Sequence, residues 1–368
     1  MHATNWNYAA SLAVALKNMD RTRQARGKWL DSAGYGPLET PSTVLHSVPG
    51  LNVRKYGGDA NDGPALLIVP APIKRSYIWD LAPEVSVVRR CLDRGFQVYM
   101  AEWTPAPDDG DDFGLDDYGD RLLRVCQQVI QTDSGASKIV VAGHSLGGIL
   151  AAIFSGLHPE LVSATILLEA PLHFGADCGC FAPMIKSTPD ARPIAVACKQ
   201  VPGTFLNMVS AAASPQAFQY ERLVDRWLSM MDPQALKTHM RVERWTHDEF
   251  SLPGRLFTDI VESLYRNDEL TRGTLAIGER TVGPADLRAP LLTVYDPRST
   301  VIPPQSVLPF HEATASENKV ALRYEGDIGV CLQHVGVLVG TSAHTVMWPA
   351  IFDWLARISD EAGEFAKA

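Results

Sequence analysis

The sequence lacks any cluster of basic residues. Its 368 residues include 33 Lys and Arg against 42 Asp and Glu, giving a formal net charge of −9 and a pI near 5.6. Proteins that grip nucleic acid through its phosphates need a basic surface. The composition therefore argues against a nucleic-acid partner.

Long apolar stretches are also lacking. No run reaches the roughly 18 apolar residues that would span a bilayer. The first residues, 1–17, have neither the basic lead-in nor the long apolar core of a secretory signal. We therefore expect no transmembrane segment and a cytoplasmic location.

Cysteine is sparse, with six in the whole chain. Cys178 and Cys180 lie close together, but a gap of one residue is shorter than the usual metal-binding spacings. This pattern predicts cytosolic thiols. We expect neither a metal nor a dissociable cofactor.

Short apolar runs alternate with helical patterns through most of the chain. The predicted strands, the first of them either one strand or a hairpin, cover residues 44–56, 65–69, 96–103, 138–142, 164–168, 290–295 and 320–324. Strands that alternate with helices predict an α/β fold with a mostly parallel sheet and helices on both faces. Ligands of such sheets bind at the carboxyl ends of the strands.

The pattern changes between residues 174 and 283. This stretch has helix-like segments without strand alternation, which predicts a helical cap inserted into the sheet. Residues 1–40 are predicted as an N-terminal helical extension, and residues 41–173 and 284–368 as the core.

One motif stands between a predicted strand and a predicted helix: Gly143-His144-Ser145-Leu146-Gly147. A serine exposed on a strained strand-to-helix turn needs small neighbours, and the glycines meet that need. The N-terminus of the following helix also favours negative charge beside the serine oxygen. The motif predicts a nucleophile elbow with Ser145 as the nucleophile.

A serine hydroxyl needs a base to remove its proton, and that base is usually a histidine held by a carboxylate. In enzymes with this elbow the histidine follows the last strand, and His334 lies there. His344, the alternative, lies at the start of the final helix and is expected to face away. His144 is expected to pack beside the elbow.

Six further stretches carry a recognisable pattern: residues 69–81, 98–105, 115–118, 241–245, 301–304 and 333–336. Together with the elbow they resemble the polyhydroxyalkanoate synthases, and through them the α/β-hydrolase family. The resemblance covers most of the chain. It implies an α/β-hydrolase fold and a catalytic triad.

The sequence departs from that family at the nucleophile, where the synthases carry cysteine and this chain has Ser145. A thiolate accepts acyl groups from thioesters and leaves easily, which suits repeated chain transfer. A base-activated serine suits acyl-enzymes that water cleaves. The change favours hydrolysis without excluding transfer.

The second departure concerns the acid of the triad, because Ser299 stands where the family has aspartate. Asp296 lies three residues earlier. Glu169, at the end of the strand after the elbow helix, occupies the place used by a subset of α/β hydrolases that includes haloalkane dehalogenases. A buried carboxylate there needs a partner, and His334 would provide one, so Glu169 is the expected acid and Asp296 the alternative. Asp327 is expected to be a turn residue.

The family pattern places the oxyanion hole at the backbone N–H groups of Ile73 and Leu146, since Pro72 has no N–H. Trp245, Phe250 and Phe257 are candidates to line an acyl tunnel, although aromatic residues in helices are more often core.

These residues predict a serine hydrolase, esterase or polyester depolymerase-like, acting on esters or thioesters, with 3-hydroxyacyl units or polyesters as candidate substrates. One alternative is a serine-dependent polyhydroxyalkanoate synthase or acyl-CoA acyltransferase. Another is a catalytically degenerate protein that binds a polyester granule or a synthase subunit. A dehalogenase is disfavoured because it needs a carboxylate at position 145. A homodimer is compatible with the sequence.

Overall fold

The computed structural model describes residues 2–58, 62–105 and 113–361. The sequence also predicts a polar turn at 59–64, a loop at 104–114 and a frayed end at 360–368, and each of these three segments lies partly outside the described ranges.

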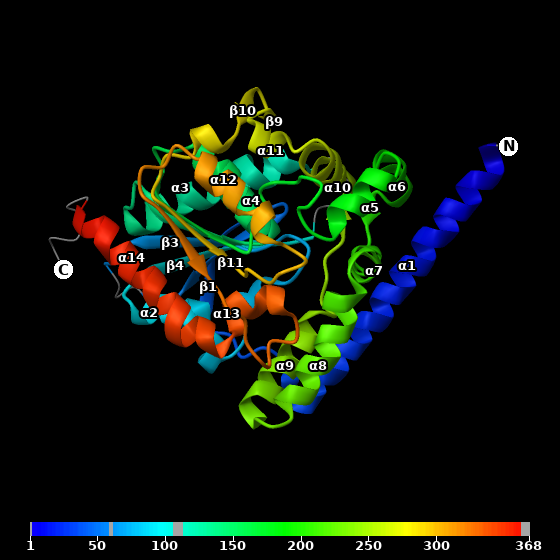
Figure 1. The fold of residues 1–368 in the computed structure, drawn as a ribbon, viewed down its shortest axis with the longest axis horizontal. Helices are drawn as coiled ribbons and strands as arrows, with labels where there is room; N and C mark the ends of the chain where they lie inside the picture. The colour runs from blue at the N-terminus through cyan, green and yellow to red at the C-terminus, as the bar shows by residue number, and fades with distance from the viewer. Residues whose placement is uncertain (1, 59–61, 106–112, 362–368) are drawn as a thin grey trace.

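An eight-stranded sheet forms the centre of the molecule (Figure 1). Its strands are β1 (Ser42–Val48), β2 (Leu51–Tyr56), β3 (Ala65–Val69), β4 (Gln97–Trp103), β5 (Ile139–His144), β6 (Val162–Leu168), β11 (Leu291–Tyr295) and β12 (Lys319–Arg323). Their order in the sheet is β1-β2-β4-β3-β5-β6-β11-β12. The pairs from β4 to β12 are parallel, whereas β1 pairs with β2, and β2 with β4, in antiparallel fashion. The mostly parallel sheet is as predicted.

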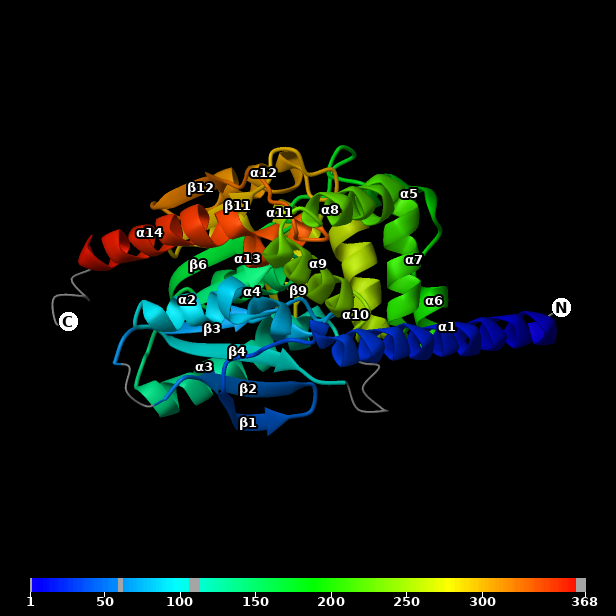
Figure 2. The same cartoon turned by 90° about the horizontal axis from the view of Figure 1, so that it is seen from below.

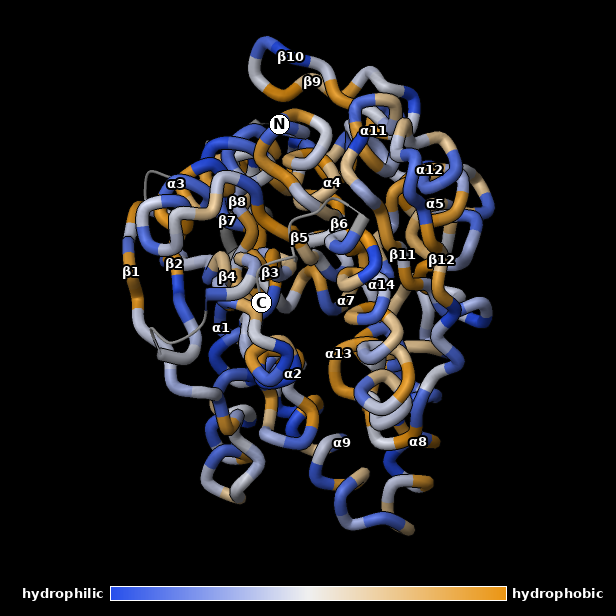
Figure 3. The backbone as a smooth tube through the Cα atoms, turned by 90° about the vertical axis from the view of Figure 1, so that its left-hand side faces the viewer, coloured by the Kyte–Doolittle hydropathy of each residue, from blue (hydrophilic) through white to orange (hydrophobic). Residues whose placement is uncertain are grey.

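Helices cover both faces of this sheet. On the core they are α2 (Val87–Asp93), α3 (Leu122–Ser134), α4 (Leu146–Leu157), α12 (Leu308–Ala313), α13 (Gly336–Val339) and α14 (Trp348–Glu361). Alternate residues of one strand face opposite sides: in β3, Leu67 packs with α3 and α4, and Ile68 packs with α2, α13 and α14. Because both faces are covered, the central strands are apolar throughout, and Figure 3 shows them as hydrophobic segments inside the molecule.

The segment between β6 and β11 is mainly helical. Its helices are α5 (Phe181–Ser187), α6 (Arg192–Cys198), α7 (Gly203–Ala213), α8 (Glu221–Ser229), α9 (Pro233–Trp245), α10 (Gly254–Asp259) and α11 (Glu269–Arg272). Four short strands that we did not predict also lie here: β7 (Gln200–Val201), β8 (Leu252–Pro253), β9 (Leu275–Ile277) and β10 (Arg280–Val282). They form two small antiparallel pairs outside the main sheet. Two or three residues are too few to show alternation. We refer to residues 174–283 as the cap segment, and its status as a separate domain stays a prediction.

A long N-terminal helix, α1 (His2–Leu30), lies against the cap segment. In the cap segment α1 contacts α6, α7 and α9, and Figure 2 shows the N-terminal end of α1 projecting beyond the rest of the molecule. Asp20 accepts a hydrogen bond at 2.7 Å from the backbone N–H of Thr204, at the start of α7. The extension is therefore docked on the cap segment by specific contacts.

Membrane-spanning potential is low in the part of the chain that the structure describes. No single helix there is both long and apolar enough to cross a bilayer, although the bent pair 333–339 and 343–360 meets the length and composition test jointly, with a 47° bend.

Candidate active site

Ser145 lies on a strained turn between β5 and α4. Its φ of 57° and ψ of −128° are unusual for a residue with a side chain. The turn is held by a 3.0 Å hydrogen bond from the Ser145 N–H to the carbonyl of Leu168 on β6. A Cβ on Gly147 would lie 2.1 Å from the carbonyl oxygen of Val69, so glycine is required where α4 passes β3. This is the geometry of a nucleophile elbow.

A cavity of about 260 Å³ opens beside Ser145. His334, Ile73 and Leu146 also line it. Most of the other lining side chains are apolar. Many of these apolar side chains come from the cap segment, among them Phe181, Ile185, Leu206, Val209, Phe218, Leu252, Phe257, Ile260, Val261 and Tyr265. The cavity therefore lies between the carboxyl edge of the sheet and the cap segment, and it suits an apolar acyl chain.

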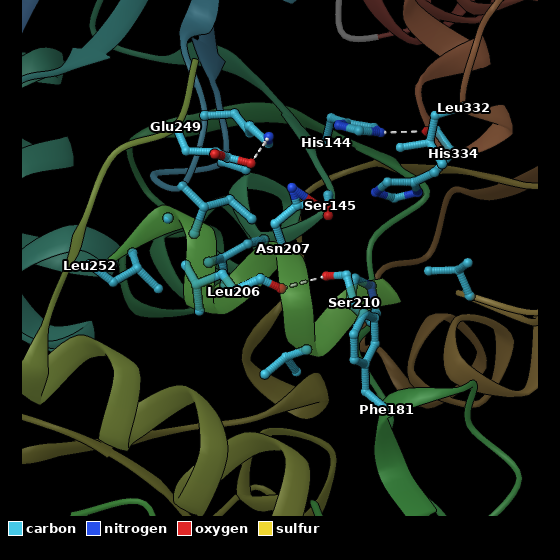
Figure 4. Close-up of a pocket in the computed structure, with 18 of the residues that line it drawn as sticks. His144, Ser145, Phe181, Leu206, Asn207, Ser210, Glu249, Leu252, Leu332 and His334 are labelled. Carbon is cyan, nitrogen blue, oxygen red and sulfur yellow. Dashed lines mark hydrogen bonds and ion pairs between the residues drawn. The ribbon is translucent and has the colours of Figure 1, made fainter. Parts of the chain in front are cut away.

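His334 reaches this cavity from the loop after β12, and Figure 4 shows its imidazole directed toward Ser145. Its backbone carbonyl accepts a 2.8 Å hydrogen bond from Nε2 of His144, and the two rings lie 4.5 Å apart. Burial lowers the pKa of His334 to about 4 because desolvation disfavours the charged imidazolium. At neutral pH the imidazole is uncharged and able to accept a proton.

Two other histidines lie as expected. His144 packs beside the elbow and supports His334. His344 is buried, with Nε2 at 2.9 Å from the carbonyl of Leu338, and it is absent from the cavity lining.

Glu169 follows β6 directly and faces His334. Its Oε2 lies 3.7 Å from Nδ1 of His334, and neither atom has a hydrogen-bond partner in the described part of the chain. The other carboxylate oxygen accepts the backbone N–H of Asp296. Glu169 is 1% exposed, and burial raises the pKa of its carboxyl well above the usual range. A distance of 3.7 Å is longer than a hydrogen bond, so the pair would tighten when His334 becomes charged.

The other candidate acids lie differently. Oδ1 of Asp296 accepts the backbone N–H of Arg298 at 2.8 Å, and the described residues include no hydrogen bond between Asp296 and His334. Ser299 accepts the N–H of Ile302 at 3.0 Å and so shapes the loop. Asp327 lies in the loop after β12, outside any assigned turn, and accepts hydrogen bonds from the hydroxyls of Tyr324 and Ser342.

The two predicted oxyanion donors flank the serine. In the described part of the chain, the N–H groups of Ile73 and Leu146 make no hydrogen bond to a protein acceptor. Both remain available to a ligand, and their role as an oxyanion hole stays a prediction.

Two of the three aromatic candidates line the cavity and one does not. Trp245 and Phe257 line the cavity, and Nε1 of Trp245 donates to the carbonyl of Arg75 at 2.8 Å. Phe250 is absent from the lining, and its ring stacks under the guanidinium of Arg75 at 3.9 Å.

A charged cluster at one side of the cavity escaped the sequence reasoning. Figure 4 shows Glu249 at one side of the cavity, and Nζ of Lys74 lies 2.6 Å from it. The Glu249 carboxylate also pairs with Arg23 of α1 at 2.9 Å. Burial lowers the pKa of Lys74 to about 8, although Glu249 opposes the shift. The pairing joins residues 23, 74 and 249, and no local pattern connects such distant positions.

Comparison with known sequences places these features in a wider group. A family model described as alpha/beta hydrolase fold matches residues 64–228. The poly(3-hydroxyalkanoate) polymerase subunit PhaC of Haloferax mediterranei is 29% identical over 96% of this chain and 70% of its own length. The PhaC subunit of Allochromatium vinosum is 25% identical over 86% of this chain and 88% of its own.

Solved structures give the same fold. A monoacylglycerol lipase of Paleococcus ferrophilus has a TM-score of 0.52 and 15% identity, covering 84% of this chain and 99% of its own. An enol-lactonase of Burkholderia xenovorans has a TM-score of 0.53 and 12% identity, covering 86% and 100%. At such identities the likeness concerns the fold alone. Taken with the sequence relatives, it shows that this chain has an α/β-hydrolase fold and is similar over most of its length to poly(3-hydroxyalkanoate) polymerase subunits.

Proposed function

We propose that this protein is an acyltransferase that carries a 3-hydroxyacyl group on Ser145 and passes it to a hydroxyl group of an acceptor or growing polyester. The single observation behind the proposal is that Ser145, on its strained turn, shares an apolar cavity with His334. Relatives named as polymerases over most of the chain support transfer as the outcome.

The proposed chemistry uses two equivalent half-reactions. The Ser145 Oγ attacks the acyl carbonyl of a thioester while His334 takes the hydroxyl proton. The thiol leaves with that proton, and an acyl-serine remains. His334 then removes the proton of an acceptor hydroxyl, which attacks the acyl-serine, and gives that proton to the Ser145 Oγ as the bond to the acyl group breaks. Glu169 stabilises the imidazolium, and the N–H groups of Ile73 and Leu146 stabilise each tetrahedral oxyanion.

The experiment is incubation with 3-hydroxybutyryl-CoA, followed by analysis of released CoA, oligoester and free 3-hydroxybutyrate. Wild type is expected to form oligoester, and Ser145→Ala is expected to lose CoA release. Release by Ser145→Ala at the wild-type rate would exclude the mechanism.

Ester hydrolysis is the second candidate, because serine in place of the synthases' cysteine favours attack by water on the acyl-enzyme. It predicts free acid instead of oligoester in the same incubation. Ser145→Cys tests this reasoning and is expected to raise the ratio of oligoester to free acid. Absence of any turnover would favour the third candidate, a non-catalytic protein that binds polyester or a synthase subunit.

A further inference from the structure

The loop that carries His334 is held to the core on one side by Asp327. The carboxylate of Asp327 accepts the hydroxyl of Tyr324 at 2.8 Å and the hydroxyl of Ser342 at 2.6 Å. The side-chain amide of Gln333 donates to the Asp327 carbonyl at 2.6 Å. These contacts fix both ends of the loop to the core.

A second carboxylate reaches the same loop from the cap segment. Oδ1 of Asp225, on α8, accepts the N–H of Gly329 at 2.8 Å, and Oδ2 accepts the N–H of Cys331, also at 2.8 Å. Oδ2 further accepts Nδ1–H of His239 on α9 at 2.7 Å. The side chains of Asp225 and His239 are 8% and 2% exposed. One buried carboxylate thus binds three donors from two segments of the fold.

The backbone conformation of the loop depends on contacts with the surrounding structure. Cys331 has a φ of 61°, which is unfavourable for a residue with a side chain and persists where surrounding contacts impose it. A Cβ on Gly329 would lie 2.7 Å from the carbonyl oxygen of Ala235 on α9. Helix α9 therefore packs directly against Gly329, one of the two residues whose N–H groups Asp225 binds.

The clamped residues lead straight into the site. Cys331 precedes Leu332, which lines the cavity, and the N–H of Val335 donates to the Leu332 carbonyl at 3.0 Å. His334 lies within this short turn. Residues 332–334 follow Cys331 in this constrained backbone, so a displacement of Cys331 also displaces the imidazole of His334.

We propose that Asp225 is a positioning residue that sets the place of His334 relative to Ser145, so that the cap segment controls the base of the core. The inference rests on the proposed function. Asp225 acts through the backbone at 329–331 and does not touch the reacting atoms. Misplacing a base by an ångström costs up to about a hundredfold in rate, whereas substrate affinity depends on the cavity walls. Loss of the hydrogen bonds from Gly329 and Cys331 to Asp225, which we call the clamp, should consequently lower kcat more than it raises KM.

The test variant is Asp225→Asn, which keeps the size of the side chain but turns one acceptor into a donor that faces N–H groups. The chain offers a matched control in Asp268, which accepts Nδ1–H of His173 at 2.7 Å and the N–H of Phe174 at 3.0 Å. Asp268→Asn removes the same kind of carboxylate–histidine–backbone contact away from the His334 loop. Each variant is assayed for p-nitrophenyl ester turnover, for Ser145 inactivation by a fluorophosphonate, and for thermal unfolding.

We expect Asp225→Asn to lower both kcat and the fluorophosphonate rate about tenfold to a hundredfold, with KM within about twofold. Asp268→Asn should keep both rates within about twofold, even if its Tm falls by as much as the Tm of Asp225→Asn. A folded Asp225→Asn protein with wild-type rates, or equal losses in the two variants, overturns the proposal.

If Asp225→Asn does not fold, His239→Gln removes one donor and leaves the carboxylate on the loop. A smaller fall in the fluorophosphonate rate is expected there, and an unchanged rate overturns the proposal. Wild type that resists the fluorophosphonate, or Ser145→Ala that keeps turnover, would instead defeat the proposed function. Failure of the clamp leaves a fluorophosphonate-sensitive wild type, so the two failures are distinguishable.

Discussion

At the scale of the residue, burial decides the properties of the site. His334 and Glu169 face each other in a buried site, and desolvation there disfavours the charged form of each side chain. A neutral imidazole beside Ser145 is ready to accept a proton, and it becomes charged during the reaction. The Glu169 carboxylate, 3.7 Å away, then gains a partner that its resting state lacks.

The pKa of His334 leads to a prediction about pH. Because burial lowers it to about 4, the neutral base persists as pH falls and is lost near pH 4. The pKa of the Glu169 carboxyl is raised by burial, so the profile is measured in Glu169→Gln, which removes that titrating group. We expect the residual kcat/KM of this variant for an uncharged ester to stay level from pH 7 to about pH 5 and to fall below that. Circular dichroism at each pH controls for unfolding. A profile with its midpoint near the ordinary histidine value of about 6.5 would contradict this environment.

The choice of acid leads to a second prediction. Glu169→Gln is expected to lower kcat at least about a hundredfold, because the imidazolium loses its carboxylate. Asp296→Asn is expected to keep most of the activity, since the Asp296 side chain bonds its own loop. Steady-state kinetics of both variants checks this, and a loss confined to Asp296→Asn would assign the acid to that residue.

Sequence reasoning predicted the residues of the candidate site whose signals are local, and the structure brings Ser145 and His334 to one cavity. Ser145 has glycine neighbours in a fixed spacing, and His334 follows the last strand. Asp225 was missed because a buried aspartate in an amphipathic helix looks like any surface aspartate in the sequence. Its backbone partners, Gly329 and Cys331, lie about a hundred residues away along the chain. Only this tertiary contact distinguishes Asp225 from a surface aspartate.

At the scale of the element, the close packing of β3, β5 and α4 fixes the elbow. The predicted strands at 65–69 and 290–295 match β3 and β11 to within one residue, because strands buried on both faces are uninterrupted apolar runs. The short strands β7 to β10 depend on pairing between segments, which no local pattern records.

The packing at Gly147 leads to a third prediction. Gly147→Ala would bring a methyl group within 2.1 Å of the Val69 carbonyl, so α4 must move away from β3. We expect a loss of about 3 kcal/mol in the free energy of unfolding, measured in urea. The control is Gly135→Ala, where a Cβ meets nothing within 4 Å but φ is 76°, and about 1 kcal/mol is expected. Equal losses in the two variants would show that crowding at β3 is unimportant.

At the scale of the whole molecule, three parts of the chain meet around one cavity. The core supplies Ser145 and His334 to the cavity lining, the cap segment supplies most of the apolar walls that face them, and Arg23 of α1 pairs with Glu249 of the lining. Long-range ion pairs join these parts, such as that of Arg23 with Glu249.

Docking of α1 leads to a fourth prediction. Arg23 donates to both carboxylate oxygens of Glu249 and, at 2.6 Å, to the Thr246 carbonyl. Lys74 also donates to Oε1 of Glu249 and to that carbonyl, so Arg23→Met leaves Oε2 of the partly buried Glu249 without its donor. We expect a loss of about 2 kcal/mol. Arg26→Met is the control, because Arg26 is 61% exposed in its pair with Glu243, and below about 1 kcal/mol is expected. Thermal unfolding compares them, and equal stability of wild type and Arg23→Met would refute the role of this contact.

The central claim is that acyl transfer proceeds through Ser145. Its most direct test is peptide mass spectrometry of protein quenched with acid during turnover of 3-hydroxybutyryl-CoA. We predict a 3-hydroxybutyryl ester on the peptide that contains Ser145, absent from Ser145→Ala, whose CoA release is also lost. An acyl group on another residue, or wild-type CoA release by Ser145→Ala, would contradict the claim.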